Sequence, residues 1–164
     1  MTLPLQNHPK LIGRFHPDYP NDIQVLVHDG GPRISSVSPE LIWVTVISER
    51  NSIFRGRILN APHNLKSVSQ YDEISFLVPD GSPHPVLVTS KYLNERNLWK
   101  IYPCDKCGMS EIFDAPSDFF KAVFPNAPQD AIPECFTSKC PICGGVMALE
   151  YQSKPPKAWW QFWK

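Results

Sequence analysis

Two Cys-x-x-Cys-Gly motifs constrain the fold of this chain more than any other feature. The first runs from Cys104 to Gly108 and the second from Cys140 to Gly144. Cysteines at this spacing occupy tight turns whose backbone N–H groups point at the sulfurs, and the following glycine can take the positive φ that ends such a turn. Four thiolates gathered in this way form the closed tetrahedral site of structural zinc centres. We therefore expect one Zn²⁺ to be bound by Cys104, Cys107, Cys140 and Cys143.

Two alternatives stay open for these cysteines. The pairs can instead form two disulfides or remain free, buried thiols. Cys135, the fifth cysteine, can replace one ligand, since it precedes Cys140 by five residues. We expect Cys135 to be a buried or free thiol, because a tetrahedral ion takes four sulfurs and the two motifs supply them with the same geometry. A site closed by four thiolates leaves no position for water, which favours structural over catalytic zinc.

Length and composition exclude several classes of protein. A chain of 164 residues suits one compact domain, or a small domain with an appended module. The 16 basic and 16 acidic side chains cancel, which argues against a broad electrostatic grip on nucleic acid. No apolar stretch approaches the roughly 20 residues that span a bilayer. Residues 1–10 lack the apolar run of a signal peptide, so we expect a cytoplasmic protein whose thiols stay reduced.

The pattern of apolar residues predicts a mainly β fold with a minor helical part. Short β-branched or alternating segments end at turn signals such as Asn51 and the Pro79–Pro83 segment, and the 18 prolines fit short strands better than long helices. Residues 41–48 are apolar on both faces, which predicts a central, covered strand. We expect a small bent β-barrel or meander with strands at 22–28, 41–48, 52–59, 71–78, 84–89 and 98–102.

Three of these segments resemble a known family. They are Ile42-Trp-Val-Thr-Val46, Phe54-Arg-Gly-Arg-Ile-Leu-Asn60 and Tyr71-Asp-Glu-Ile-Ser-Phe76. They are similar to the Trp-Val, Gly-x-Leu-x-Asn and Gly-Asp-Glu-Val-x-Phe strands of small bacterial β-proteins catalogued as domain of unknown function 2314. The resemblance covers roughly residues 40–78 and implies a small β fold with no established activity. Tyr71 stands where the family pattern has glycine.

Four segments follow from these patterns. An N-terminal arm with one strand is expected over residues 1–38, pinned to the protein by Leu11, Ile12 and Phe15. The barrel-like domain covers 39–103, the zinc ribbon 104–151, and an aromatic tail 152–164. The ribbon ends in a strand over residues 146–151.

The ribbon is expected to carry a helical insertion. Asp114 or Ser117 can cap a short helix, and Pro116 is tolerated in its first turn. The apolar face of this helix, which we expect to dock on the barrel, consists of Phe119, Phe120, Val123 and Phe124.

The C-terminal tail concentrates large aromatic residues, namely Trp159, Trp160, Phe162 and Trp163. Three interpretations are open. The tail can fold back on its own domain, bind a partner protein through tryptophan anchors, or lie at a membrane surface with Lys157 and Lys164 beside the rings.

Our leading functional hypothesis is a non-catalytic protein-interaction module, with an accessory or immunity-type bacterial role within that class. The alternative is RNA binding through a basic face with Trp43 nearby, formed by Arg33, Arg50, Arg55, Arg57 and Lys66. The same arginines can instead protect a solvated strand edge. A hydrolase built on His28 and Asp29, with His63 and His84 from loops, is the third hypothesis.

Overall fold

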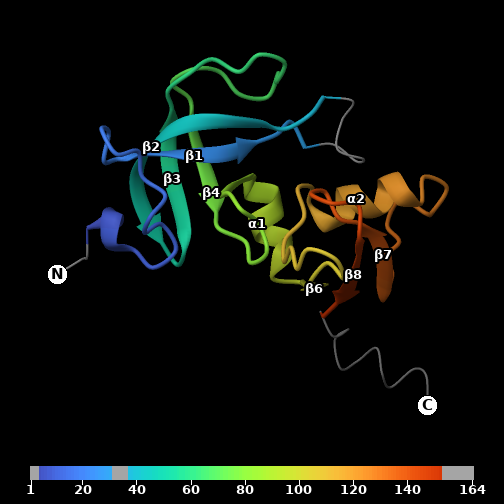
Figure 1. Ribbon diagram of the computed structural model, residues 1–164. Coiled ribbons are helices and arrows are strands. Elements are labelled where there is room, and N and C mark those ends of the chain that lie inside the picture. Colours follow the sequence, from blue (N-terminus) through green and yellow to red (C-terminus); the bar gives the residue numbers. More distant parts are fainter. Residues whose placement is uncertain (1–3, 31–36, 153–164) are drawn as a thin grey trace.

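The computed structural model describes residues 4–30 and 37–152 as two β units lying side by side (Figure 1). The first is a closed barrel whose strands follow one another in chain order: β1 (Asp22–Val27), β2 (Glu40–Arg50), β3 (Ile53–Ile58), β4 (Glu73–Leu77) and β5 (Val86–Val88). Neighbouring strands are antiparallel, and a parallel pairing of Leu26 with Val86 closes the ring. The expected mainly β fold with a barrel is confirmed. No helix in the described ranges is long and apolar enough to cross a membrane.

Strand alternation fills the barrel interior. Ile42, Val44 and Val46 of β2 face the core, and the rings of Phe54 and Phe76 stack inside it at 5.5 Å. The expectation that the β2 segment is covered on both faces is wrong. Its other face points outward: Ile47 is 46% exposed, and the remaining outward residues are only partly covered. One face therefore packs the core while the other is available at the surface.

Two tight connections hold non-glycine residues at positive φ. Asn51 and Ser52, with φ of 54° and 64°, join β2 to β3 as the hairpin signal at Asn51 predicts. Tyr71 precedes β4 with φ of 72°. Its backbone adopts a conformation that glycine favours.

The N-terminal arm lies against the barrel. It begins with a 3₁₀ turn, η1 (Leu5–Asn7), and Leu11 is completely buried in the core while Phe15 packs at its margin and bridges to Ile23. The expected anchor Ile12 is 63% exposed and does not pin the arm. Because β1 is a barrel strand, the barrel begins well before residue 39.

The second unit is an antiparallel sheet in the order β6 (Trp99–Tyr102), β8 (Val146–Tyr151), β7 (Cys135–Lys139). The strand expected at 98–102 is present, but it pairs with β8 and not with the barrel. The sequence patterns did not predict β7, nor the helix α1 (Ser90–Arg96) that leads into β6. Thr89 begins α1 by accepting a hydrogen bond from the Tyr92 N–H at 3.1 Å.

The predicted insertion forms α2 (Pro116–Val123), which lies beside β7 and β8 (Figure 1). The expectation about its cap is wrong. Neither Asp114 nor Ser117 caps the helix: its first turn is held by Glu95 of α1, whose carboxylate accepts from the Ser117 N–H and Oγ at 2.9 and 2.8 Å. The Phe119 and Phe120 rings pack on Phe136 of β7, and all three belong to or pack against a buried cluster that also contains barrel residues.

A second hydrophobic core joins the two units. Leu77, Val86 and Val88, from the last two barrel strands, belong to the same buried cluster as Trp99 and Leu149 of the sheet. The barrel wall therefore supplies one side of the core on which β6, β8 and α2 pack.

The conformation of Tyr71 leads to a testable prediction. A non-glycine residue in the left-handed region costs about 1–2 kcal/mol, whereas glycine there costs about 0.5–1 kcal/mol of additional chain entropy. Because the Tyr71 side chain is 65% exposed, its loss removes few contacts. We expect Tyr71→Gly to raise the free energy of unfolding by about 0.5–1 kcal/mol. Urea denaturation measures this change. Tyr71→Val, which is β-branched, is the control that should lower it, and a destabilised glycine variant would contradict the prediction.

Candidate metal centre

Four cysteine sulfurs converge where the two Cys-x-x-Cys turns meet. The Sγ atoms of Cys104, Cys107, Cys140 and Cys143 all lie within 4.8 Å of one another. Cys104 and Cys143 are 3.4 Å apart, and Cys107 and Cys140 are 3.6 Å apart. An ion bound tetrahedrally at about 2.3 Å from each sulfur separates them by about 3.8 Å, close to these values. All five cysteines are free, so the disulfide alternative is wrong.

The two turns share one backbone geometry. The Gly108 N–H donates to the Cys104 carbonyl and the Gly144 N–H to the Cys140 carbonyl, both at 3.0 Å. Both glycines have φ of 77°, and a side chain on either would meet open space. The positive φ therefore explains these glycines, as the motif predicts.

Backbone N–H groups point at the sulfurs. Lys106 donates to the Sγ of Cys104 and Ile142 to that of Cys140, each at 3.4 Å. Hydrogen bonds from the Cys107 and Lys106 backbones, acting against desolvation, lower the pKa of the Cys104 thiol to about 6. Burial raises the pKa of Cys140 to about 12. A bound cation favours the thiolate form of every ligand, so it would overcome the burial cost at Cys140.

A third glycine of the site, Gly145, lies against the sulfur cluster. A Cβ on Gly145 would stand 2.6 Å from the Cys104 Sγ and 2.8 Å from the Asp105 Oδ1. Asp105 joins the first turn to β8, since its Oδ1 accepts from the Val146 N–H at 2.8 Å and its own N–H donates to the Val146 carbonyl at 3.1 Å. The sequence analysis did not single out Gly145 or Asp105. The Gly-Gly pair after Cys143 was the available signal.

The barrel contacts the first cysteine turn directly. A Cβ on Gly81, in the β4–β5 connection, would stand 2.3 Å from the carbonyl carbon of Gly108. Beside this contact, the Asp80 N–H donates to the Ser110 Oγ at 3.0 Å, and the Ser110 N–H donates to the Asp80 carbonyl at 3.1 Å. The candidate site is therefore continuous with the barrel.

Cys135 lies outside the sulfur cluster. It is a free thiol, but it is exposed at the start of β7 and not buried. The group of potential ligands found among the described residues contains the other four cysteines without it.

His28 is part of the structure's hydrogen-bonded interior. Its Nε2 lies 2.9 Å from the Leu87 carbonyl, and its Nδ1 accepts from the Gly30 N–H at 3.0 Å. These partners select the neutral tautomer with the proton on Nε2. The ring also stacks on Phe113 at 4.2 Å. Burial, opposed by the Leu87 bond, lowers the pKa of His28, so the ring is neutral near pH 7.

Asp29 is bound by the loop after β3. Its carboxylate accepts from the Lys66 and Ser67 N–H groups and from the Ser67 hydroxyl at 2.6–3.0 Å. His28 and Asp29 both line a cleft of about 460 Å³, but neither His63 nor His84 does. The histidines of the hydrolase hypothesis are therefore not gathered in this cleft.

The expected basic face is interrupted by an acidic side chain. Arg55 and Arg57 of β3 both pair with Glu73, at 2.7 and 3.3 Å. Because β3 has β2 and β4 as neighbours, these arginines do not protect a strand edge, and that interpretation is wrong. Arg33 lies outside the described residues, as do the four aromatic residues of the tail.

Scans against protein-family models, curated proteins and solved structures return no match to this chain. The fold and the site define its class by themselves. It is a β-barrel protein, joined to a three-stranded sheet, with four cysteines placed to bind a metal ion.

The close approach of Gly145 to a sulfur leads to a second prediction. A methyl group at this position displaces the Cys104 thiol, whereas Gly144→Ala meets open space and costs only about 1–2 kcal/mol of backbone strain. We expect Gly145→Ala to weaken metal binding at least about tenfold, equivalent to ~1.4 kcal/mol. Competition with a chromogenic chelator measures the affinity. Equal affinities for the two variants would contradict the steric argument.

Proposed function

We propose that this chain is a non-catalytic protein-interaction module whose metal site binds a structural Zn²⁺. The observation that carries the proposal is the convergence of four cysteine sulfurs within 4.8 Å of one another. Thiolates are preferred zinc ligands, and four of them complete its tetrahedral shell. No coordination position is then left for a substrate or a water, so the ion acts on the structure and not on a reaction.

The proposed ion links segments that are far apart in the chain. One pair of ligands follows β6, and the other lies in the turn between β7 and β8. An ion held by both pairs would connect the segment that follows β6 to the turn between β7 and β8, next to the barrel. Structural zinc sites in small peptides bind with about 10–16 kcal/mol, and much of this free energy stabilises the fold. A reducing, cytoplasmic environment keeps the thiols available, and we propose that location.

We propose the aromatic tail as the partner-binding segment. Four large aromatic residues follow β8 in the sequence: Trp159, Trp160, Phe162 and Trp163. The strand β8 pairs with β6, which leads into the first pair of cysteines. Large aromatic residues are the commonest anchors of protein interfaces. An accessory or immunity-type bacterial role fits such a small binding module. Two observations weigh against RNA binding: the zero net charge, and the pairing of Arg55 and Arg57 with one glutamate.

The zinc proposal is tested on purified, reduced, full-length protein. We expect elemental analysis to find about one zinc per chain in the wild type. Cys140→Ser should lose the metal and lower the unfolding free energy by several kcal/mol, because it opens the site and leaves three thiolates around the ion. Cys135→Ser is the matched control, since its thiol is exposed and outside the cluster. Metal-free wild type, or metal loss in Cys135→Ser, would contradict the proposal.

The interaction proposal is tested by replacing Trp159, Trp160 and Trp163 with alanine. The variant should keep its zinc content and thermal stability but lose the partner that cross-linking identifies with the wild type in the native host. Replacement of Lys154 and Lys157 with alanine is the control that leaves the rings in place. Unchanged capture by the tryptophan variant would refute the assignment. If the wild type binds anionic lipid vesicles and captures no protein, and the tryptophan variant no longer binds the vesicles, the tail is assigned to a membrane surface instead.

A further inference from the structure

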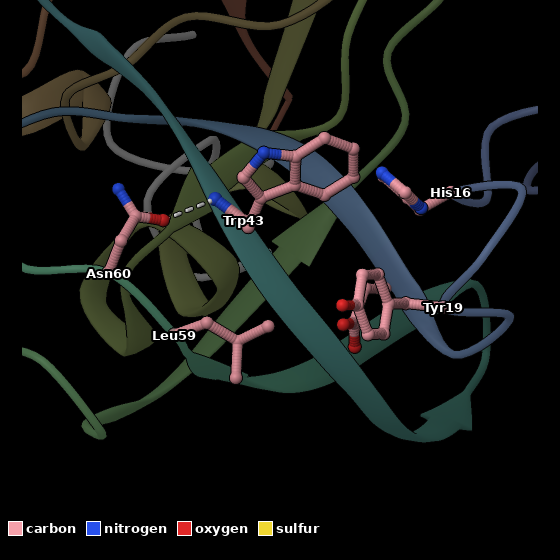
Figure 2. Close-up of a pocket in the computed structure, with 6 residues that line it drawn as sticks. His16, Tyr19, Trp43, Leu59 and Asn60 are labelled. Carbon is pink, nitrogen blue, oxygen red and sulfur yellow. Dashed lines mark hydrogen bonds between the residues drawn. The ribbon is translucent and has the colours of Figure 1, made fainter.

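The outer wall of the barrel contains an aromatic pocket that the proposed function does not use (Figure 2). Its volume is about 320 Å³. It is lined by three aromatic rings, one carboxylate, one aliphatic side chain and one amide, from His16, Tyr19, Trp43, Asp22, Leu59 and Asn60. The sequence analysis singled out only Trp43, because the other rings come from the arm that precedes β1.

The three rings are inclined to one another and enclose the pocket from different directions. The His16 ring lies 5.0 Å from the Trp43 ring with an interplanar angle of 71°, and 5.0 Å from the Tyr19 ring with an angle of 50°. Figure 2 shows His16 and Tyr19 on one side of the pocket, across from Trp43 and Leu59. Rings at such angles do not stack fully on each other, so parts of their faces remain available to a ligand.

Backbone hydrogen bonds hold these walls in place. The His16 N–H donates to the Asp22 carbonyl at 2.9 Å, and the Asp22 N–H donates to the Tyr19 carbonyl at 3.0 Å. On the opposite wall, the Trp43 N–H donates to the Asn60 Oδ1 at 2.9 Å, as Figure 2 shows. The pocket is therefore formed before a ligand arrives, which lowers the entropy cost of binding.

The pocket contains a negative charge without a positive partner. The Asp22 Oδ1 accepts from the Thr45 hydroxyl at 2.7 Å, and no lysine or arginine of the described residues forms an ion pair with Asp22. Aromatic faces attract cations through their quadrupole, and a carboxylate adds direct attraction. Both features of this pocket favour a cationic ligand.

The apolar walls of the pocket favour a methylated ammonium group over an unmodified one. An unmodified ammonium group has N–H donors that lose their water on entry. The surface that lines this pocket is mainly apolar, and the Asn60 Oδ1 and the Asp22 Oδ1 already accept hydrogen bonds from the protein. A trimethylammonium group presents methyl groups to the rings and carries its charge without N–H donors. The volume is near the lower end of the roughly 300–1,000 Å³ range of ligand pockets, which suits a head group.

We propose that the pocket of His16, Tyr19, Trp43 and Asp22 binds a trimethylammonium group. The group can belong to a choline-like small molecule or to a trimethylated lysine in a peptide, and the chemistry of recognition is the same for both. This proposal does not depend on the metal site or on the function proposed for the tail.

The test compares ligands of equal shape and different charge by calorimetry on the full-length protein. Choline is titrated beside 3,3-dimethylbutan-1-ol, in which carbon replaces the charged nitrogen. We expect the neutral analogue to bind at least about tenfold more weakly, because it lacks the cation–π and carboxylate interactions. Equal affinity for the two compounds, or no binding of choline or of a trimethyllysine peptide at millimolar concentration, would overturn the proposal.

Three variants locate the site. Asp22→Asn keeps an acceptor for Thr45 and should remove most of the preference for choline over its neutral analogue. Trp43→Leu should weaken the binding of both choline and its neutral analogue. Asp18→Asn, an exposed change on the same loop, should bind like the wild type. Unchanged choline binding by Asp22→Asn and Trp43→Leu would also overturn the proposal, provided that both variants unfold at the wild-type temperature.

The source of the group is distinguished in the same experiment. A peptide with one trimethyllysine is compared with its unmethylated form and with choline. Tighter binding of the methylated peptide than of choline supports a protein ligand, and equal or weaker binding supports a small molecule. Equal binding of the methylated and unmethylated peptides would overturn the requirement for the trimethylammonium group.

Discussion

The meeting of four thiols in one small volume is the constraint on which the sheet and its connections depend. Thiolates within 4.8 Å of one another repel strongly unless a cation lies among them. The two turns that carry them have the same hydrogen bonds and the same glycine φ, so each presents its sulfurs in the same way. Placing both turns together determines where β6, β7 and β8 begin or end.

Close backbone contacts connect this site to the rest of the protein. Gly145 lies against the Cys104 sulfur, and Gly81 of the barrel lies against Gly108 of the first turn. A side chain at Gly81 or Gly145 would push the barrel or the sheet away from the cysteine cluster. Leu77 and Val88 of the barrel also share a hydrophobic core with Leu149 of the sheet, and this core connects the two units over a larger area. The cysteine cluster, the barrel and the sheet are therefore joined by continuous packing.

The barrel then serves two purposes in our interpretation. Its last hairpin supports the candidate metal site, while its first two strands, the preceding arm and the two residues after β3 form the aromatic pocket on the outer wall. Leu11 in the core and the Phe15 bridge hold the arm in place. The proposed ion beside the β4–β5 connection and a preformed pocket on the outer wall are compatible with a binding protein that changes its shape little on binding.

The sequence by itself determined the local structure: the strands with β-branched alternation, the turn at Asn51, a helix after Pro116, and the two cysteine turns. These features depend on residues close together in the chain, whose preferences are readable without the rest of the protein. Only the tertiary structure decided that β6 pairs with β8, that Glu95 holds the start of α2, and that His16 meets Trp43. Each of these outcomes depends on which distant surfaces bury the most apolar area together, and residue spacing carries no record of that.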